Sequence, residues 1–363
     1  MYNKTMRSNI CGIILKVSYP TLEDTSSIEI LGKPMLDWVS FALGESYCGS
    51  VVNSDGLPLP VLVRPYLIKE SEYTVVLYSD TPLITRKTVL DAVTALKQND
   101  LNALKMTRGY VFRTQYLLSI DKLPPISPYY FDEEDFMTAF NYKQIGMLTD
   151  ALKNRIISYH MNNGVHFQDP STTTIGCDVI IGKGVTIGSF NVIRGKTVIK
   201  DKARIGDRNT IDGSVIDEGA SIESSYVLSG VIGKHSKIGP FAYIRPGTVV
   251  GDDCRVGDFV EIKASRLGSG VKAAHHAYIG DASVGDDVNI GCGVVVANYD
   301  GKTKNRTIIG EKSFVGSNCN LVAPIHIGDD SFIAAGSTVT EDVPPSSFVI
   351  ARERQTTKPR KDK

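Results

Sequence analysis

Two adjacent histidines in the segment AAHHAYIGD, residues 273–281, are the first candidates for chemistry in a chain with only six histidines. Histidine titrates near neutral pH, so a neutral imidazole can act as a general base. The repeat around His275 and His276 decides whether either side chain is exposed enough to do this.

From residue 175 onward, an aliphatic residue stands at every sixth position, with a small or β-branched residue four places after it. The series begins with Ile175, Ile181, Ile187, Ile193, Ile199, Ile205 and Ile211. An amphipathic helix repeats at 3.6 residues and a strand at 2, so neither explains a period of six. The period predicts a left-handed parallel β-helix, with one short strand per step and three steps per coil.

The repeat slips and is interrupted without being lost. It shifts by one residue near position 216 and takes five-residue steps at Leu267 and Val284. Between Val296 and Ile309 the polar segment NYDGKTKNRT contains a turn-forming Asp-Gly pair, which predicts a loop leaving the coil. The repeat then returns and ends at VPPSSF.

The phase of the repeat places the two histidines. Ala273 and Ile279 take the aliphatic positions and Ala277 takes the small inward position. His275, His276 and Tyr278 therefore lie off the buried stripe. The same phase predicts that Asn289 and Asn298 lie outside the core.

Two cations occupy matching positions in successive coils. Arg245 and Lys263 each follow an inward isoleucine and are eighteen residues apart, so their backbones should lie about 4.8 Å apart on one face. Like charges stacked in this way repel, and a shared anion such as phosphate would remove the repulsion. The alternative is that both side chains extend into solvent or pair with Glu261 and Asp258.

Composition limits the classes of partner. The 363 residues, 42% hydrophobic and 22% charged, are enough for two domains with cores of their own. Forty basic and forty acidic residues leave no net charge, which disfavours nucleic acid or membrane as partners and favours a small molecule. The six cysteines show no metal-ligand spacing, and the first apolar run is too short for a signal peptide or a span, so we expect a cytoplasmic protein.

Longer segments of the second half resemble a known family. The run from YIRPGTVVGDDCRVGDFVEIKASRLG through KAAHHAYIGDASVGDDVNIG and ANYDGKTKNRTIIG to VGSNCNLVAP, IAAGSTVTEDV and VIARERQ is similar to the C-terminal domain of the bacterial bifunctional GlmU family. The resemblance implies a homotrimeric acetyltransferase that uses acetyl-CoA to acetylate glucosamine-1-phosphate. It also implies an active site shared between subunits, in a route to UDP-N-acetylglucosamine and cell-wall peptidoglycan.

The resemblance also assigns roles to single residues. It implies that His275 is the catalytic base and that His276, where the family has an apolar residue, is not. Asn298 and Tyr299 match residues that hold the sugar and the catalytic base. The implied binders of the sugar phosphate and hydroxyls are Arg245, Lys263, Tyr278, Asn289 and Lys304. The implied acetyl-CoA contacts are Cys292, which stands where alanine is expected, with Ser317, Ala335 and Arg352.

The first half resembles a sugar nucleotidyltransferase, an α/β fold. ILGKPMLDWV and YTVVLYSDTPLITRKTV carry the similarity, which implies that Asp80 would hold Mg²⁺. Where the family has its glycine-rich phosphate loop, this chain reads GIILKVSYPTLEDTSS, without the glycines, arginine and lysine that a pyrophosphate requires. We expect a degenerate domain without uridylyltransferase activity, in which the magnesium site is vestigial and Mg²⁺ matters only if the domain is active.

These features predict four regions and leave two alternatives open. The regions are an α/β domain at 1–160, a linker at 161–171, the β-helix at 172–345 and a basic tail at 346–363. The first alternative is an N-acetyltransferase for another amino sugar or a nucleotide sugar, because His276 and Thr303 depart from the family pattern. The second is a zinc site of the carbonic anhydrase type, with ligands among His275, His276 and His326 of neighbouring subunits.

Overall fold

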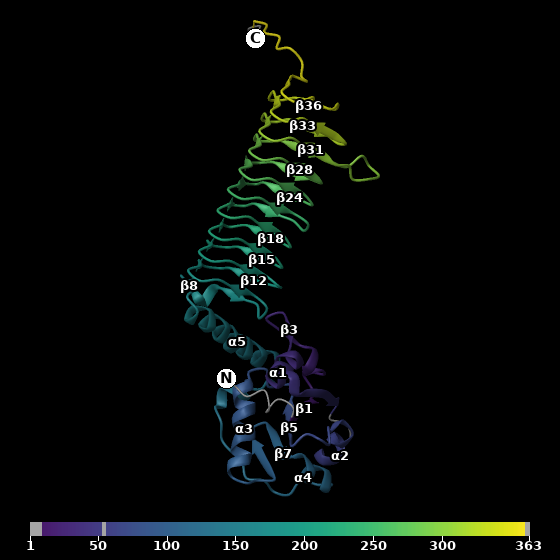
Figure 1. The fold of residues 1–363 in the computed structure, drawn as a ribbon, viewed down its shortest axis with the longest axis vertical. Coiled ribbons are helices and arrows are strands. Elements are labelled where there is room, and N and C mark those ends of the chain that lie inside the picture. Colours follow the sequence, from purple (N-terminus) through teal and green to yellow (C-terminus); the bar gives the residue numbers. More distant parts are fainter. Residues whose placement is uncertain (1–8, 53–55, 360–363) are drawn as a thin grey trace. The chain divides into compact units, whose positions relative to one another are not determined.

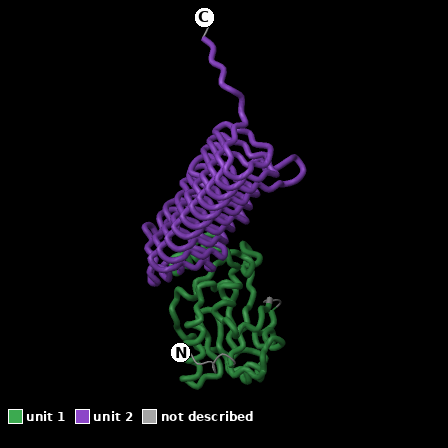
Figure 2. Tube along the Cα trace, turned by 45° about the horizontal axis from the view of Figure 1, so that its top comes forward, with its two compact units in different colours: residues 1–155 green, residues 156–363 purple. Residues whose placement is uncertain are grey.

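The computed structural model describes residues 9–52 and 56–359. The chain divides into two compact units, Met1–Arg155 and Ile156–Lys363 (Figure 2).

The first unit is built on a mixed five-stranded sheet in the order β4-β1-β5-β7-β6. Three of its strands, β1, β5 and β7, are labelled in Figure 1. β1 is parallel to β4 and β5, whereas β7 is antiparallel to both β5 and β6. The strands of this unit are β1 (Ile10–Lys16), β2 (Glu29–Ile30), β3 (Lys33–Pro34), β4 (Tyr47–Val52), β5 (Tyr73–Tyr78), β6 (Ala103–Met106) and β7 (Gly109–Arg113). Its helices are α1 (Met35–Leu43), α2 (Leu59–Val63), α3 (Arg86–Gln98), α4 (Thr114–Ser119) and α5 (Tyr142–Asn162), which continues into the second unit.

Both faces of this sheet are buried, as the apolar runs in its strands require. Along β1, Ile10 and Ile14 pack into one core cluster together with residues of α1 and α3. Cys11 and Ile13 belong to the opposite cluster, which includes residues of α2 and α4. Alternate residues of a strand point to opposite faces, so a strand apolar at every position is covered on both sides. The predicted α/β fold of the first half is confirmed.

The second unit is the left-handed parallel β-helix that the period of six predicts. Its strands form three parallel sheets, with each coil contributing one strand to each sheet (Figure 1). Sheet I contains β8 (His166–Phe167), β11 (Thr186–Ile187), β14 (Arg204–Ile205), β17 (Ser221–Ile222), β20 (Lys237–Ile238), β23 (Arg255–Asp258), β26 (Lys272–His275), β29 (Asn289–Ile290), β32 (Phe314–Val315), β35 (Phe332–Ile333) and β37 (Phe348–Val349). Sheet II contains β9 (Thr174–Ile175), β12 (Val192–Arg194), β15 (Thr210–Asp212), β18 (Tyr226–Leu228), β21 (Tyr243–Ile244), β24 (Glu261–Lys263), β27 (Tyr278–Gly280), β30 (Val295–Ala297), β33 (Asn320–Val322) and β36 (Thr338–Val339). Sheet III contains β10 (Ile180–Ile181), β13 (Val198–Ile199), β16 (Val215–Ile216), β19 (Val231–Ile232), β22 (Val249–Val250), β25 (Arg266–Leu267), β28 (Ala282–Val284), β31 (Thr307–Ile309) and β34 (Ile325–Ile327).

The repeat residues build one continuous core along the coil axis. The aliphatic series from Ile175 to Val339 and the small residues four places later are buried or packed against the same cluster. Glycine follows the aliphatic residue where neighbouring coils approach closely: a Cβ on Gly182 would lie 2.7 Å from the backbone nitrogen of Asp201. The coil is thus held by parallel backbone pairing outside and aliphatic packing inside.

Two details go beyond what the sequence predicted. The expected linker at 161–171 is partly ordered into the first coil, because Val165 and Phe167 are buried in the core cluster and β8 pairs with β11. Asn298 is 4% exposed, although its side chain contacts Asp281 and Tyr278 and is not part of the aliphatic core cluster. It is covered because the loop that follows β30 folds back, with the Asn305 N–H donating to the Asn298 carbonyl at 2.7 Å.

The predicted excursion from the coil is present. The segment between β30 and β31 stands away from the strands as a loop (Figure 1). Among the described residues, none of the helices combines the length and the apolar character needed to cross a bilayer.

Candidate functional site

His275 lies at the end of β26, directly opposite Asp258 of β23 in the preceding coil. Its Nδ1 is 2.7 Å from Asp258 Oδ1. The hydrogen bond to His275 is the main reason that the pKa of Asp258 is lowered, so this carboxylate is ionised and accepts the Nδ1–H bond. The imidazole side chain is 55% exposed, and no described protein group hydrogen-bonds Nε2. His275 is therefore an oriented imidazole with an accessible second nitrogen.

His276 has a different environment. It is the corner residue of its coil, with φ of 41°, and its ring packs at 4.9 Å from the ring of Phe259 in the coil before. Phe259 stacks in turn on Phe241 at 5.5 Å. His276 thus extends an aromatic column rather than the Asp258–His275 pair.

The expected acetyl-CoA contacts lie in register with His275 along sheet I. Ala273 pairs with Ile290, Ile290 with Val315, and Val315 with Ile333. Residues two places after these four are His275, Cys292, Ser317 and Ala335, one per coil. Cys292, Ser317 and Ala335 are exposed, and Arg352 lies beside Gly336 in the last coil. At about 4.8 Å per coil, the column from His275 to Ala335 is about 14 Å long.

On sheet II, the two predicted phosphate-binding cations each contact a carboxylate. Arg245 Nη1 lies 2.7 Å from Glu261 Oε1, and this hydrogen bond raises the pKa of Arg245. Lys263 Nζ lies 3.6 Å from Asp281 Oδ2. Arg245 therefore pairs with Glu261, which was the alternative to a shared phosphate. Asp258, the other carboxylate named in that alternative, pairs with His275 instead.

The polar groups of sheet II continue through Asn298 and Tyr278. Asn298 Nδ2 donates to Asp281 Oδ2 at 2.5 Å and lies 3.5 Å from the Tyr278 hydroxyl. Both side chains lie over Gly280, where a Cβ would meet them at 2.5 and 2.6 Å. Lys263, Asp281, Asn298 and Tyr278 therefore form one connected cluster.

The loop after β30 brings Tyr299 and Lys304 together. They form an isolated antiparallel bridge, and Lys304 Nζ lies 4.3 Å from the centre of the Tyr299 ring. Asp300 accepts hydrogen bonds from the N–H groups of Thr303 and Lys302, and the pKa of Asp300 is strongly lowered by them and by the Asn305 amide. The loop is thus a structured element that holds the Lys304 ammonium beside the Tyr299 ring.

A single chain does not bring all expected residues to one surface. Asn289 lies on sheet I, where it pairs with Lys272 and Phe314, whereas Arg245 and Lys263 lie at the end of their strands on sheet II. The sequence reasoning did not assign Asp258 to His275 and did not single out Asp281. Counting one coil back from His275 and from Asn298 would have found both positions.

The first unit gives Asp80 protein partners rather than an open coordination site. Asp80 is 0% exposed and accepts two hydrogen bonds from Arg108, at 2.8 and 2.7 Å, and one from the Tyr19 hydroxyl at 2.5 Å. Burial, followed by the hydrogen bond to Asp80, raises the pKa of Tyr19, which keeps its proton. Arg108 neutralises the charge that a cation would need, so these residues do not fit a bound Mg²⁺.

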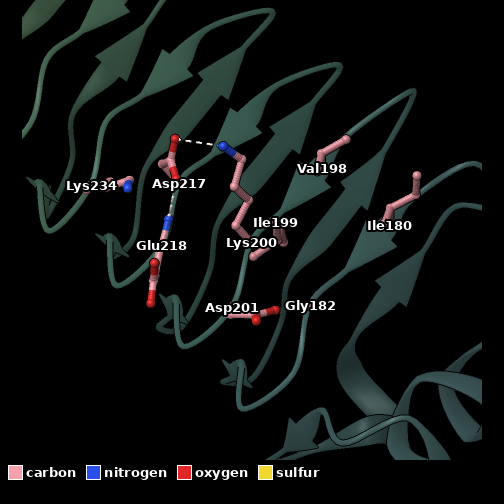
Figure 3. Close-up of a pocket in the computed structure, with 9 residues that line it drawn as sticks. All are labelled: Ile180, Gly182, Val198, Ile199, Lys200, Asp201, Asp217, Glu218 and Lys234. Atoms are coloured by element: carbon pink, nitrogen blue, oxygen red, sulfur yellow. Dashed lines mark hydrogen bonds and ion pairs between the residues drawn. The ribbon is translucent and has the colours of Figure 1, made fainter.

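Other surface features offer less. A shallow pocket on sheet III, lined by residues that include Lys200, Asp217 and Lys234, lies in the early coils (Figure 3). Lys200 Nζ and Asp217 Oδ2 pair at 2.9 Å, and none of the expected site residues lines it. In residues 9–52 and 56–359, no three His, Cys, Asp or Glu side chains are grouped so as to hold a metal ion. His326 lies on sheet III, apart from His275 on sheet I.

Comparison with known proteins gives matches in both units. The family model for the bacterial transferase hexapeptide (six repeats) matches residues 229–264 and 306–341. A bifunctional protein GlmU from Acetivibrio thermocellus is 34% identical over 423 residues, covering 99% of this chain and 89% of that protein. The protein of the same name from Clostridium novyi is 49% identical over 212 residues, covering 58% of this chain and 46% of its own length. Among solved structures, a UDP-N-acetylglucosamine acyltransferase from Campylobacter jejuni is 20% identical, with a TM-score of 0.31, covering 51% of this chain and 70% of its own. A similarity at that TM-score supports no inference about this chain.

Proposed function

Because this chain belongs to the GlmU family, we propose that its β-helix unit transfers the acetyl group of acetyl-CoA to the amine of glucosamine-1-phosphate. The observation that carries the proposal is the column in which an oriented, exposed His275 stands at one end of a row of small exposed residues that leads to Arg352. We place this reaction in the cytoplasm, as the scattered cysteines suggested.

The chemistry follows from the free nitrogen of His275. Nε2 accepts a proton from the sugar amine as the amine nitrogen bonds to the thioester carbonyl carbon. The C–S bond of the tetrahedral intermediate then breaks, and the sulfur leaves as CoA, with the proton returned by the imidazolium. The products are N-acetylglucosamine-1-phosphate and free CoA. Asn298 and the Tyr278 hydroxyl, 3.5 Å apart, would help to hold the acceptor.

The donor path follows the column along sheet I. Small side chains at Cys292, Ser317 and Ala335 leave room for an extended pantetheine chain against the coil. Arg352 and the basic residues after it suit the phosphates of CoA. In this assignment the thiol of Cys292 lines the donor path and is not a nucleophile.

The acceptor site is proposed to require a second copy of the chain. Arg245, Lys263, Tyr299 and Lys304 would bind the phosphate and hydroxyls from sheet II, whereas Asn289 lies on sheet I. A homotrimer in which sheet I of one chain faces sheet II of the next would bring both sets to one sugar. Mixing inactive His275→Ala and Arg245→Ala chains under exchange conditions would restore activity only if sites are shared.

We further propose that the first unit has lost uridylyl transfer. The support is the buried Asp80, whose two oxygens are engaged by Arg108 and Tyr19, together with the absence of a glycine-rich phosphate loop. This unit then has no need for Mg²⁺. UTP turnover above background with N-acetylglucosamine-1-phosphate and Mg²⁺ would contradict the proposal.

One specific observation keeps a second acceptor in consideration. His276, on the Phe259 ring next to His275, adds a polar aromatic group beside the expected acceptor. Chromatographic measurement of free CoA with glucosamine-1-phosphate, glucosamine and UDP-glucosamine as acceptors separates the two. We expect the highest kcat/KM with glucosamine-1-phosphate; a preference for UDP-glucosamine would favour the nucleotide sugar.

A further inference from the structure

We propose that Asp258 is a positioning residue that holds His275 in one tautomer, with the proton on Nδ1 and the basic lone pair on Nε2. The inference rests on the proposed function, in which His275 accepts the proton of the amine. It adds a residue that neither the repeat nor the family resemblance assigned to the reaction.

The coil itself brings the two side chains together. Asp258 and His275 are directly opposed on adjacent strands, and each is followed by a corner residue in the left-handed region, Phe259 with φ of 56° and His276 with φ of 41°. The N–H of His276 donates to the Asp258 carbonyl at 2.9 Å. Because the two coils turn the same corner in the same conformation, their side chains leave the backbone in parallel, and the 2.7 Å contact follows from the register.

The charge of Asp258 decides which nitrogen carries the proton. An ionised carboxylate can only accept, so the nitrogen that faces it must be an N–H. A neutral imidazole has one N–H and one lone pair, which leaves the lone pair on Nε2. Without Asp258, both tautomers would be populated and part of the enzyme would present an N–H to the amine.

The pair has little reason to be there for stability. The side chains are 55% and 34% exposed, and even full ion pairs with such exposure contribute little to folding. The same exposure limits the catalytic effect, because water can partly replace the carboxylate. We therefore expect a loss far below the ~10⁴-fold seen when the buried aspartate of a serine protease triad is changed.

The experiment compares full-length Asp258→Ala and Asp258→Asn chains with a matched control. Asp212→Ala is the control, because Asp212 also contacts a side chain one coil away, Arg194 at 2.8 Å, and is 37% exposed. Steady-state kinetics give kcat and both KM values. Nitrogen-15 NMR of histidine-labelled protein in the solid state reports the tautomer of His275, whose signals are identified by their loss in His275→Ala.

We expect Asp258→Ala to lower kcat about tenfold or more, with both KM values within twofold, and to convert the single His275 tautomer into a mixture. Asp258→Asn offers an amide that can either accept a hydrogen bond from Nδ1–H or donate one to the Nδ1 lone pair, so it no longer fixes the tautomer and should lose kcat at least as much as Asp258→Ala. The control should match the unaltered protein in both readouts. A single unchanged tautomer in Asp258→Ala, or a kcat equal to that of the control, would overturn the inference. If the unaltered protein acetylated no amino sugar, the proposed function would fail, while the NMR signal would still decide the role of Asp258.

Discussion

Replacing Asp80 by alanine should destabilise the first unit far more than removing an ion pair of the same chemistry from its surface. Asp80 is 0% exposed and accepts three hydrogen bonds, two from Arg108 and one from Tyr19. Removing one partner of a buried ion pair costs roughly 3–5 kcal/mol, because the other charge is left buried and unpaired. The Arg108 side chain is 26% exposed and can be partly hydrated after the change, so we expect the lower end, about 3 kcal/mol.

Urea unfolding followed by tryptophan fluorescence measures this unit alone. Trp38, the single tryptophan of the chain, lies in α1. With a urea dependence of about 1–3 kcal/mol/M, a loss of about 3 kcal/mol moves the midpoint by about 1–3 M. Asp121→Ala is the control: Asp121 pairs with Arg64 at 2.8 Å but is 84% exposed, so its removal should cost less than about 1 kcal/mol.

The outcome separates a structural carboxylate from a catalytic one. A loss in Asp80→Ala no larger than in the control would refute the account of a buried ion pair. A gain in stability accompanied by loss of a magnesium-dependent reaction of UTP would instead identify Asp80 as a metal ligand.

Substitutions at three other positions test the donor path, the acceptor cluster and a buried histidine. Ala335→Trp should block the donor column and raise the KM for acetyl-CoA by more than about tenfold, about 1.4 kcal/mol, without changing the KM for the acceptor; equal effects on both would contradict the assignment. Gly280→Ala would place a Cβ 2.5 Å from the Tyr278 hydroxyl and 2.6 Å from the Asn298 amide, so the KM for the sugar should rise while that for acetyl-CoA stays the same. Burial lowers the pKa of His160 below its ordinary value of 6.5. The stability that depends on a neutral His160 is therefore complete above pH 6.5, and it is lost as the pH falls through the lower pKa of the folded state. Thermal unfolding at pH 8 and pH 5 should show a smaller acid loss in His160→Phe than in the unaltered chain, and identical losses would remove His160 as a cause.

The period of the repeat predicted most of the second unit because each coil is a local, nearly identical structure. One inward aliphatic residue per step fixes which side chains face out, which is why His275 and Tyr278 could be placed off the core. The burial of Asn298 was not predicted because the chain leaves the coil just after it. The loop that covers it, through the Asn305 N–H, follows no repeat.

Which side chains contact one another was harder to predict than which side chains face out of the coil. The repeat placed Asp258 and Glu261 near the two cations but could not tell that Asp258 contacts His275, since several side chains share each corner. In the first unit, Arg108 reaches Asp80 only because the turn between β6 and β7 lies beside the end of β5. That contact depends on sheet order, which local sequence does not encode.

The central claim is that His275 is the base of an acetyl transfer, and release of free CoA from acetyl-CoA with glucosamine-1-phosphate tests it most directly. We expect His275→Ala to lose roughly 10²–10⁴-fold in kcat, the usual contribution of a general base, and His276→Ala to remain within tenfold of the unaltered chain. Activity that survives in His275→Ala but disappears in His276→Ala, or no CoA release by the unaltered chain, would contradict the account.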